Sequence, residues 1–232
     1  MSLPREGKVP MKEKILLSWS GGKDSSMTLY EIQQTQNYEI AALLTTVTDG
    51  YDRISMHGVR QTLLERQAES LGLTLHKIYL SMNATNKEYE SKMETALELY
   101  QKNGVASVAF GDIFLEDLRQ YREQNLSKIG MKGLFPIWKR NTSDLVRTFV
   151  NVGFKAIVVC VDSKVLDQSF AGKLIDDDFL HQLPPGIDPC GENGEFHSFV
   201  FGGPIFKGEV SFTLGDVVLR DSFYFCDLVP VE

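Results

Sequence analysis

Apolar runs of strand length alternate along the chain with segments in which apolar residues recur at helical spacing. In one helix-like segment Leu64, Ala68 and Leu71 fall at positions i, i+4 and i+7. The strand-like runs are continuous and rich in β-branched residues, as in strands that are buried on both faces. The predicted helices cover residues 24–36, 64–71, 93–100 and 142–152, and the predicted strands cover 15–17, 40–47, 73–80, 105–110 and 156–161.

Glycines mark the ends of several predicted helices. Gly72, Gly104 and Gly153 each follow a helix-like segment and stand directly before a strand-like run. Glycine readily takes the left-handed conformation in which many helices end. The alternation therefore predicts an α/β fold, a twisted parallel sheet with helices on both faces, of the Rossmann-like type.

The pattern changes after Asp162. A short helical piece is expected over residues 174–183, where a Pro-Pro-Gly sequence ends it. Residues 210–231 are rich in Val, Phe, Leu and Tyr, which favours antiparallel strands with a turn at Gly215-Asp216. We expect a flexible lead-in over 1–13, an α/β domain over 14–125 and a smaller C-terminal α+β part over 126–232.

Composition and charge narrow the classes of function. Of the 232 residues, 43% are hydrophobic and 24% are charged, and the net charge is −7. This acidic balance argues against nucleic acid as a partner of the whole surface. No apolar run approaches the roughly 20 residues that span a bilayer, and the N-terminus has no hydrophobic signal core. We expect a cytoplasmic protein with no membrane partner.

The cysteines do not indicate a disulfide framework or a standard metal site. Cys160, Cys190 and Cys226 lie far apart, and no two of them form a C-x-x-C pair. Cys160 stands in an apolar run, where a small core residue is expected.

A glycine- and hydroxyl-rich turn follows the first predicted strand and opens the first helix. Gly21 and Gly22 allow close approach of the backbone to an anion, and the unpaired N–H groups of the helix start would point at it. Lys23 adds a donor, as do Ser20 and Ser25, while the neighbouring Asp24 offers a carboxylate to a divalent cation. The spacing matches neither a Walker loop nor a dinucleotide fingerprint. A simple chain reversal is the alternative, but it has no need of these polar groups.

Ligands of open parallel sheets bind at the carboxyl ends of the strands, which directs attention to two further loops. His57 stands before the second long predicted helix, close to Arg60, where nucleotide could be contacted or the arginine could simply be solvated. Gly111 and Asp112 follow a predicted strand, and Glu116 lies at the start of the next helix. These groups could bind metal or substrate, although the helix dipole alone also favours acids there.

The stretch from Asp188 to Phe199 carries an unusual density of polar groups between glycines. Glu192, Glu195 and His197 could be directed at one point by such a loop. They match no standard zinc site. They could orient ammonia or an amine, take up its proton, or bind a cationic part of an acceptor. A purely structural turn is the alternative.

Several motifs together resemble one known family. The Ser20–Ser25 sequence SGGKDS resembles the PP-loop ATP pyrophosphatases, adenine nucleotide α-hydrolase-like enzymes of the HUP fold that release AMP and pyrophosphate. The wider set resembles the diphthine–ammonia ligase-like family, in its short prokaryotic form, from Lys14 to the C-terminus. It comprises SWSGGKDS (18–25), MHGVR (56–60), FGDIFLEDLR (110–119), LFPIW (134–138), GFKAIVVCVD (153–162) and DPCGENGEFHSFV (188–200).

The resemblance implies an ATP-dependent, AMP-forming carboxylate–ammonia ligase whose substrates are ATP and ammonia, with Mg²⁺ as cofactor. Residues 14–125 would be the PP-loop ATP-binding domain and 126–232 the substrate-binding part. The expected ATP-binding residues are Ser18, Ser20, Gly21, Gly22, Lys23, Asp24, Ser25, His57, Gly111 and Asp112. The expected catalytic residues are Lys23, Asp24, Glu192, Glu195 and His197, the expected substrate-binding residues are Glu116, Arg119, Cys190 and Asn193, and Asp24 is the expected Mg²⁺ ligand.

The identity of the acceptor stays open. The family's best-known members amidate diphthine, a modified histidine of a translation elongation factor, in diphthamide biosynthesis, whereas others are proposed to act on corrinoids in vitamin B12 salvage. A tRNA-modifying PP-loop enzyme and a non-catalytic ATP- or AMP-binding module are the alternatives of other classes, and an interaction protein that has lost its chemistry is a third. No glutaminase-type segment is evident, so free ammonia is the expected nitrogen donor. A homodimer contact could hold the acceptor.

Overall fold

A computed structural model describes residues 12–50, 53 and 58–231 of the chain. The first sheet has five parallel strands in the order β3-β2-β1-β4-β5. They are β1 (Glu13–Ser18), β2 (Tyr38–Thr48), β3 (Leu75–Leu80), β4 (Ser107–Ala109) and β5 (Lys132–Leu134). The predicted parallel sheet is therefore confirmed.

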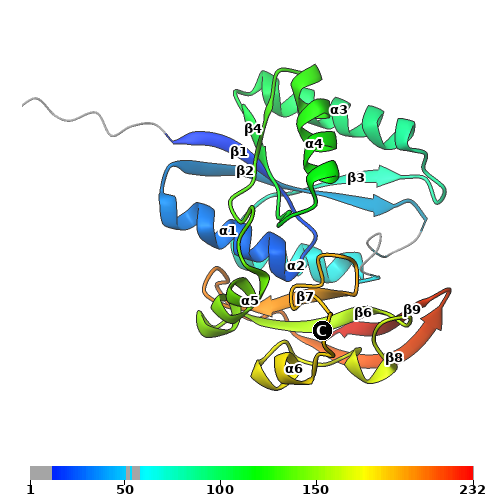
Figure 1. The fold of residues 1–232 in the computed structure, drawn as a ribbon. Helices are drawn as coiled ribbons and strands as arrows, with labels where there is room; N and C mark the ends of the chain where they lie inside the picture. Colours follow the sequence, from blue (N-terminus) through cyan, green and yellow to red (C-terminus); the bar gives the residue numbers. More distant parts are fainter. Residues whose placement is uncertain (1–11, 51–52, 54–57, 232) are drawn as a thin grey trace, which may run out of the picture.

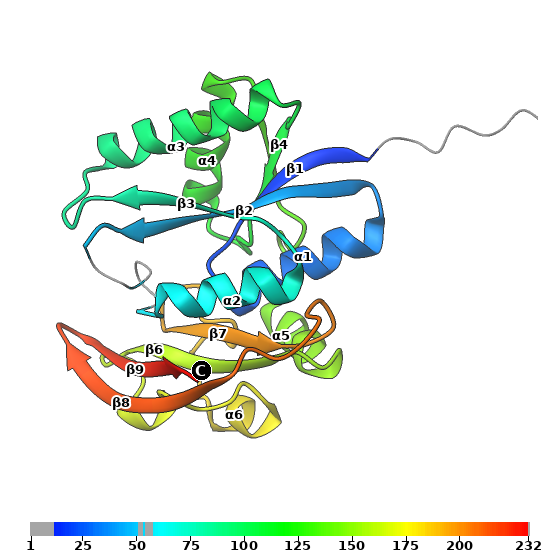
Figure 2. The ribbon, with the colours of Figure 1, turned by 180° about the vertical axis from the view of Figure 1, so that it is seen from behind.

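Helices cover both faces of this sheet, as Figures 1 and 2 show. Helices α1 (Lys23–Thr35) and α2 (Gln61–Leu71) lie on one face, and α3 (Asn86–Lys102) and α4 (Glu116–Lys128) lie on the other. Alternate residues of β1 serve the two sides. Ile15 and Leu17 join the core on the α1 side, whereas Leu16 joins the core on the α3 side.

The C-terminal part contains a second sheet, whose four antiparallel strands have the order β7-β6-β9-β8. They are β6 (Lys155–Asp162), β7 (Phe196–Gly202), β8 (Phe212–Arg220) and β9 (Phe223–Pro230). Helix α5 (Thr142–Asn151), the 3₁₀ turn η1 (Gln168–Phe170) and helix α6 (Asp177–Gln182) accompany this sheet. The antiparallel sheet and these helices confirm the expected smaller α+β part. Helices α1 and α2 lie between the two sheets (Figure 2).

Three details differ from the sequence-based expectations. Helix α6 begins only at Asp177, because the Asp176 side chain accepts a hydrogen bond from the Phe179 N–H and caps it there. The predicted turn at Gly215-Asp216 is wrong: these residues lie within β8, where the register with β9 shifts. The chain reverses after Arg220, where Asp221 takes the left-handed conformation with φ of 53°.

The first sheet also extends past residue 125, because β5 pairs with β4. We therefore propose that the boundary between the two parts lies in the connection 135–141, after β5 and before α5.

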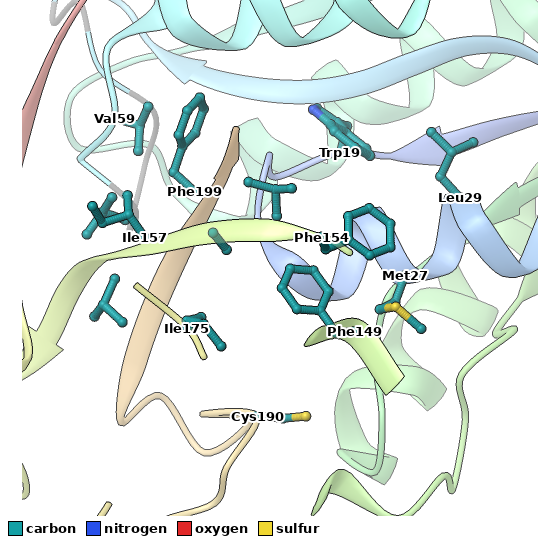
Figure 3. Packing of buried hydrophobic residues seen from close by; sticks show 14 of the residues in the cluster. Trp19, Met27, Leu29, Val59, Phe149, Phe154, Ile157, Ile175, Cys190 and Phe199 are labelled. Atoms are coloured by element: carbon teal, nitrogen blue, oxygen red, sulfur yellow. The ribbon is translucent and has the colours of Figure 1, made fainter. Parts of the chain in front are cut away.

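One large apolar core joins the two parts. Figure 3 shows Met27 of α1 beside the rings of Phe149 and Phe154, which come from the C-terminal part. These two rings stack with centroids 4.7 Å apart. Burying a side chain of this size contributes about 2 kcal/mol. Among the described residues, no helix has the length and apolar character needed to cross a membrane.

Candidate active site

A cavity of about 400 Å³ opens at the carboxyl ends of the first sheet's strands. Its walls come from segments 18–25, 44–46, 111–112 and 191–198, together with Tyr89, Met93 and Arg122 of α3 and α4. The cavity thus brings together the predicted phosphate loop, the Gly111-Asp112 loop and the polar stretch of the C-terminal part. That is the location expected for a ligand of an open parallel sheet.

The phosphate loop adopts a conformation that depends on glycine. Gly21 has φ of +77°, and a Cβ there would lie 2.6 Å from Gln67 Oε1. The next residue, Gly22, caps α1, while the Ser25 hydroxyl donates to the Gly22 carbonyl at 3.0 Å. Helix α1 therefore directs its N-terminus toward the cavity with hydroxyl groups close beside it, an arrangement suited to anion binding.

Lys23 and Asp24 form a tight ion pair in the cavity wall. Lys23 Nζ donates to both carboxylate oxygens of Asp24, at 2.7 and 2.8 Å. Burial alone would lower the pKa of Lys23, but the Asp24 carboxylate outweighs it and raises this pKa above the usual value. The ammonium group is therefore fixed and charged, as the neutralisation of phosphate requires.

Asp112 and Arg122 form a second ion pair in the cavity wall. Arg122 Nε lies 2.7 Å from Asp112 Oδ2, and its guanidinium stands 4.3 Å from the centre of the Phe110 ring. The neighbouring Gly111 allows the loop after β4 to approach the start of α1, because a Cβ on this residue would lie only 2.9 Å from the backbone carbon of Asp24. The loop after β4 is thus pressed against the start of α1.

Glu192 connects the C-terminal part to the Gly111-Asp112 loop. Its Oε1 accepts a hydrogen bond from the Ile113 N–H at 2.7 Å, and its own N–H donates to Asp188 at 2.9 Å. Burial raises the pKa of the Glu192 carboxyl to about 7, against the opposing effect of the bond from Ile113. A carboxyl with this pKa can both accept and release a proton near neutral pH.

Glu195 organises the loop from within rather than lining the cavity. Its carboxylate accepts hydrogen bonds from the Asp188 N–H at 3.1 Å and from the backbone and side chain of Asn193, each at 3.0 Å. Asn193 is exposed. Cys190 is buried behind the loop, where its thiol donates to the Thr142 carbonyl at 3.3 Å and burial raises its pKa to about 12. These three residues therefore give the loop its shape.

His197 lines the cavity beside Lys23. Burial, and then the Lys23 charge, lowers the pKa of this imidazole to about 4. His197 is accordingly neutral at pH 7.

Like Cys190 and Asn193, the other two predicted substrate-binding residues lie outside the cavity wall. Glu116 is exposed, 4.0 Å from Lys139. Arg119 bonds to Glu123 at 3.0 Å and stacks against the rings of Phe135 and Trp138. The remaining predicted residue, His57, lies outside the described residues.

Several site residues were missed by the sequence reasoning. Thr45 and Thr46 line the cavity at the end of a predicted strand, so the strand-end rule could have identified them. Gln67 is fully buried behind the phosphate loop. In the sequence, Gln67 is a polar residue on the helix face that also carries the apolar Leu64 and Ala68, and this could have identified it. Tyr89 and Arg122 gave no such signal, because on helices they resemble ordinary surface positions.

The carboxylates of the cavity are the candidate ligands for a metal ion. Among the described residues there is no group of three or more His, Cys, Asp or Glu side chains that could hold a metal ion. Mg²⁺, however, usually takes one or two carboxylates and completes its shell with phosphates and water. Asp24 and Asp112 offer such oxygens on the walls of the same cavity, so the donor set fits Mg²⁺ accompanied by a polyphosphate.

Comparisons with known proteins identify similar sequences. Residues 11–133 match the family model described as the diphthamide synthase N-terminal domain, and residues 141–222 match the diphthamide synthase C-terminal domain. The chain is 25% identical to the diphthine–ammonia ligase of Homo sapiens over 88% of its own length and 84% of the relative's. For the diphthine–ammonia ligase of Danio rerio the identity is 25%, over 87% of each chain.

A third relative differs in length. The diphthine–ammonia ligase of Schizosaccharomyces pombe is 27% identical over 93% of this chain but only 38% of its own length. The human relative, by contrast, is covered over 84% of its length, so these two eukaryotic relatives differ in length.

Proposed function

The chain belongs to the diphthamide synthase family, and on this basis we propose that it is an ATP-dependent, AMP-forming carboxylate–ammonia ligase. The substrate carboxylate attacks the α-phosphorus of ATP, which forms an acyl-adenylate and releases pyrophosphate. Ammonia then attacks the acyl carbon, which gives an amide and AMP. The observation that carries the proposal is that Gly22 and Lys23 of the phosphate loop line the same cavity as the half-buried Glu192 carboxyl.

The phosphate loop supplies the ATP half of this reaction. Ser20, Gly22 and Ser25 line the cavity at the N-terminus of α1, where the helix dipole and hydroxyl groups favour phosphate oxygens. Lys23 holds a fixed positive charge that neutralises the pyrophosphate as it leaves, an electrostatic effect that is usually large in such transfers. A bound Mg²⁺, held by Asp24 and Asp112, would supply further charge neutralisation.

Glu192 supplies the proton acceptor for amide formation. The attack of ammonia on the acyl-adenylate releases one proton, and the ionised Glu192 carboxylate is placed in the cavity to accept it. Its pKa of about 7 leaves a large ionised fraction at neutral pH. The neutral His197 contributes a hydrogen bond rather than a charge.

The remaining residues of the C-terminal loop position these groups and exclude water. Glu195 fixes the backbone between Asp188 and Asn193, so that Glu192 projects to the Gly111-Asp112 loop. The buried Cys190 closes the inner side of the loop. Exclusion of water protects the acyl-adenylate from hydrolysis. Glu116 and Arg119 would contact only an acceptor large enough to extend beyond the cavity.

The experiment that tests this function is an assay of AMP formation from ATP and ammonium with a panel of carboxylates. The panel includes an elongation factor that carries diphthine, corrinoid acids and small carboxylates. The proposal predicts that one class stimulates AMP and amide formation in equal amounts. Tight ATP binding without AMP formation from any of them would indicate a binding module instead. Bulk tRNA is assayed beside the panel, and AMP formation only with tRNA would indicate a tRNA-modifying enzyme.

A further inference from the structure

Gln67 of α2 occupies a place where a helix would normally bury an apolar side chain. It lies on the same face as Leu64 and Ala68, and its exposed fraction is 0%. A buried carboxamide is costly unless its donors and acceptor are satisfied. The hydrogen bonds that satisfy Gln67 all lead to the phosphate loop or to the strand behind it.

The carboxamide makes three hydrogen bonds. Gln67 Nε2 donates to the carbonyl of Gly21 at 2.9 Å and to the carbonyl of Val200 at 2.5 Å. Gln67 Oε1 accepts from Trp19 Nε1 at 3.0 Å. The side chain therefore binds both ends of the turn that leads from β1 to α1, and ties that turn to β7.

Strand β7 contacts the same loop directly. The Val200 N–H donates to the Gly21 carbonyl at 2.9 Å, and the Lys23 N–H donates to Ser198 Oγ at 3.1 Å. Ser198 and Val200 are two positions apart on β7, so one short segment of this strand contacts both Gly21 and Lys23. Since β7 begins directly after the Glu192 loop, the strand that carries this loop also supports the phosphate loop.

We propose that Gln67 is a positioning residue for the phosphate loop, and that through it β7 of the C-terminal sheet sets the conformation in which Gly21–Lys23 bind nucleotide phosphate. The inference rests on the proposed nucleotide-binding role of this loop. Gly21 holds a left-handed conformation with its carbonyl bound twice from behind, by Gln67 and by Val200. These bonds orient the peptide so that the N-terminus of α1 faces the cavity.

The test compares three variants in the full-length protein. Gln67→Met keeps the length of the side chain but removes all three hydrogen bonds, and Gln67→Asn keeps a carboxamide that is one CH₂ shorter. Gln61→Met is the matched control, since Gln61 lies on the same helix and its side chain donates to Glu65 at the surface, at 3.4 Å. The probe is α,β-methylene ATP with Mg²⁺, which cannot be cleaved at the bond in question.

Both Gln67 variants are expected to bind the probe about tenfold more weakly, and Gln61→Met is expected to bind it as the wild type does. Binding is measured well below each variant's melting temperature, so that only folded protein contributes. A purely structural role would lower the melting temperature and leave the dissociation constant unchanged. Wild-type affinity in both Gln67 variants would overturn the proposal.

Amide hydrogen exchange separates failure of this inference from failure of the proposed function. The Lys23 and Val200 amides are expected to exchange faster in both Gln67 variants than in the wild type or the control. If the wild type does not bind the probe, the proposed ligase function fails, while the exchange rates still test whether Gln67 holds the loop. Unchanged exchange in both variants would contradict the positioning role.

Discussion

Each charged side chain that lines the described cavity is held by a second group, and this pairing decides its chemical role. Lys23 stays cationic because its ammonium group forms an ion pair with the Asp24 carboxylate. The Arg122 guanidinium forms a second ion pair, with Asp112. The Glu192 carboxyl accepts hydrogen bonds from the neutral N–H groups of Ile113 and Phe114, and burial raises its pKa to near neutrality. The cavity therefore combines a permanent cation with a group that can exchange a proton.

Loss of the Lys23 ammonium group tests the first of these roles. Lys23→Ala is expected to reduce the rate of pyrophosphate release about 10²- to 10³-fold, the range typical of a lost electrostatic contact in the transition state. The exposed Lys87 on α3 offers a matched control, and Lys87→Ala should leave the rate unchanged. Pyrophosphate release at the normal rate by Lys23→Ala would refute the assignment of the phosphate loop.

The pKa of Glu192 predicts a pH dependence of amide formation. Because the ionised carboxylate accepts the proton, the rate should rise as the pH increases through about 7 and then level off. Glu192→Gln should be slow and lack this step. A wild-type profile that is flat between pH 6 and pH 8, measured with saturating ammonium, would remove Glu192 from the proton transfer.

The raised pKa of Glu192 also makes the stability of the folded protein depend on pH. A carboxyl whose pKa is raised on folding favours the folded state only when protonated, so its ionisation destabilises the protein as the pH rises from about 4 to about 7. Glu192→Gln should therefore melt at a higher temperature than the wild type at pH 8. This difference should vanish below pH 4. A lower melting temperature for the variant at pH 8 would contradict the assignment.

For single residues, the sequence indicated which side chains lie near the cavity better than it indicated what each side chain does there. The motifs placed Lys23, Asp24 and Glu192 in one site because their chemistry is local to glycine-rich loops. Glu195 looked equivalent to Glu192, yet its carboxylate binds its own loop. Such a difference depends on which way each side chain turns, and the spacing of carboxylates and glycines does not determine that.

At the scale of elements, close approach between two loops builds the cavity. The loop after β4 lies so near the start of α1 that a Cβ at Gly111 would contact the Asp24 backbone at 2.9 Å. Gly111→Ala should therefore displace the start of α1 and raise the KM for ATP about tenfold. Gly208→Ala is the control, because no atom lies within 4 Å of the added methyl. An unchanged KM in Gly111→Ala would show that the contact relaxes freely.

A second element-level contact fixes the segment that precedes α2 to the C-terminal sheet. Arg53 and Arg60 both bind Asp227 of β9, at 2.8 and 2.7 Å. Hydrogen bonds from Arg60 and then Arg53 lower the pKa of Asp227 to about 2, against the effect of burial. The stabilisation is present above the unfolded value near 4 and is lost as the pH falls through about 2.

Asp227→Asn tests this contact. The variant should melt about 2–4 °C below the wild type at pH 7, and the difference should shrink as the pH approaches 2. The exposed Asp216 on the neighbouring strand β8 provides the control Asp216→Asn. A melting-temperature difference that stays constant down to pH 2 would contradict the ionic origin of the effect.

The sequence predicted most elements because hydrophobic periodicity and helix-ending glycines act locally. It failed at the β8–β9 turn, where Asp221 rather than a glycine takes the left-handed conformation. Local sequence favoured Gly215, but Gly215 instead serves close packing against Asp227, whose Cβ would lie 3.1 Å from an added methyl. Contacts between strands, which are not local, decided the position of the turn.

At the scale of the whole molecule, the two parts share one apolar core and both line the cavity of the candidate site. Met27 packs with Phe149 and Phe154, while Gln67 and Ser198 link the phosphate loop to β7. We predict that residues 12–140 produced alone do not fold cooperatively. Without the C-terminal part, the apolar side chains of α1 and α2 that pack against it would be exposed to water. Circular dichroism during heating tests this, with the full chain as control. A sharp melting transition of the fragment would contradict the shared core.

The fold class followed from the alternation of elements along the chain, and the parallel sheet confirms it. The position of the second sheet against α1 and α2 did not follow, because nothing in the strand-like pattern of residues 196–202 indicates its partner. Membership of the diphthamide synthase family rests on two family models, which match residues 11–133 and 141–222 and so cover both parts. The joint construction of the site became visible only in three dimensions.

The most direct test of the proposed chemistry follows nitrogen and phosphorus in one reaction. The protein is incubated with ATP, ¹⁵N-ammonium and the carboxylate that best stimulates turnover, and the products are measured by ³¹P NMR and mass spectrometry. The account predicts AMP, pyrophosphate and a ¹⁵N-labelled amide in equal amounts, formed about 10²- to 10³-fold more slowly by Lys23→Ala. Formation of ADP and phosphate, or AMP without labelled amide, would contradict it.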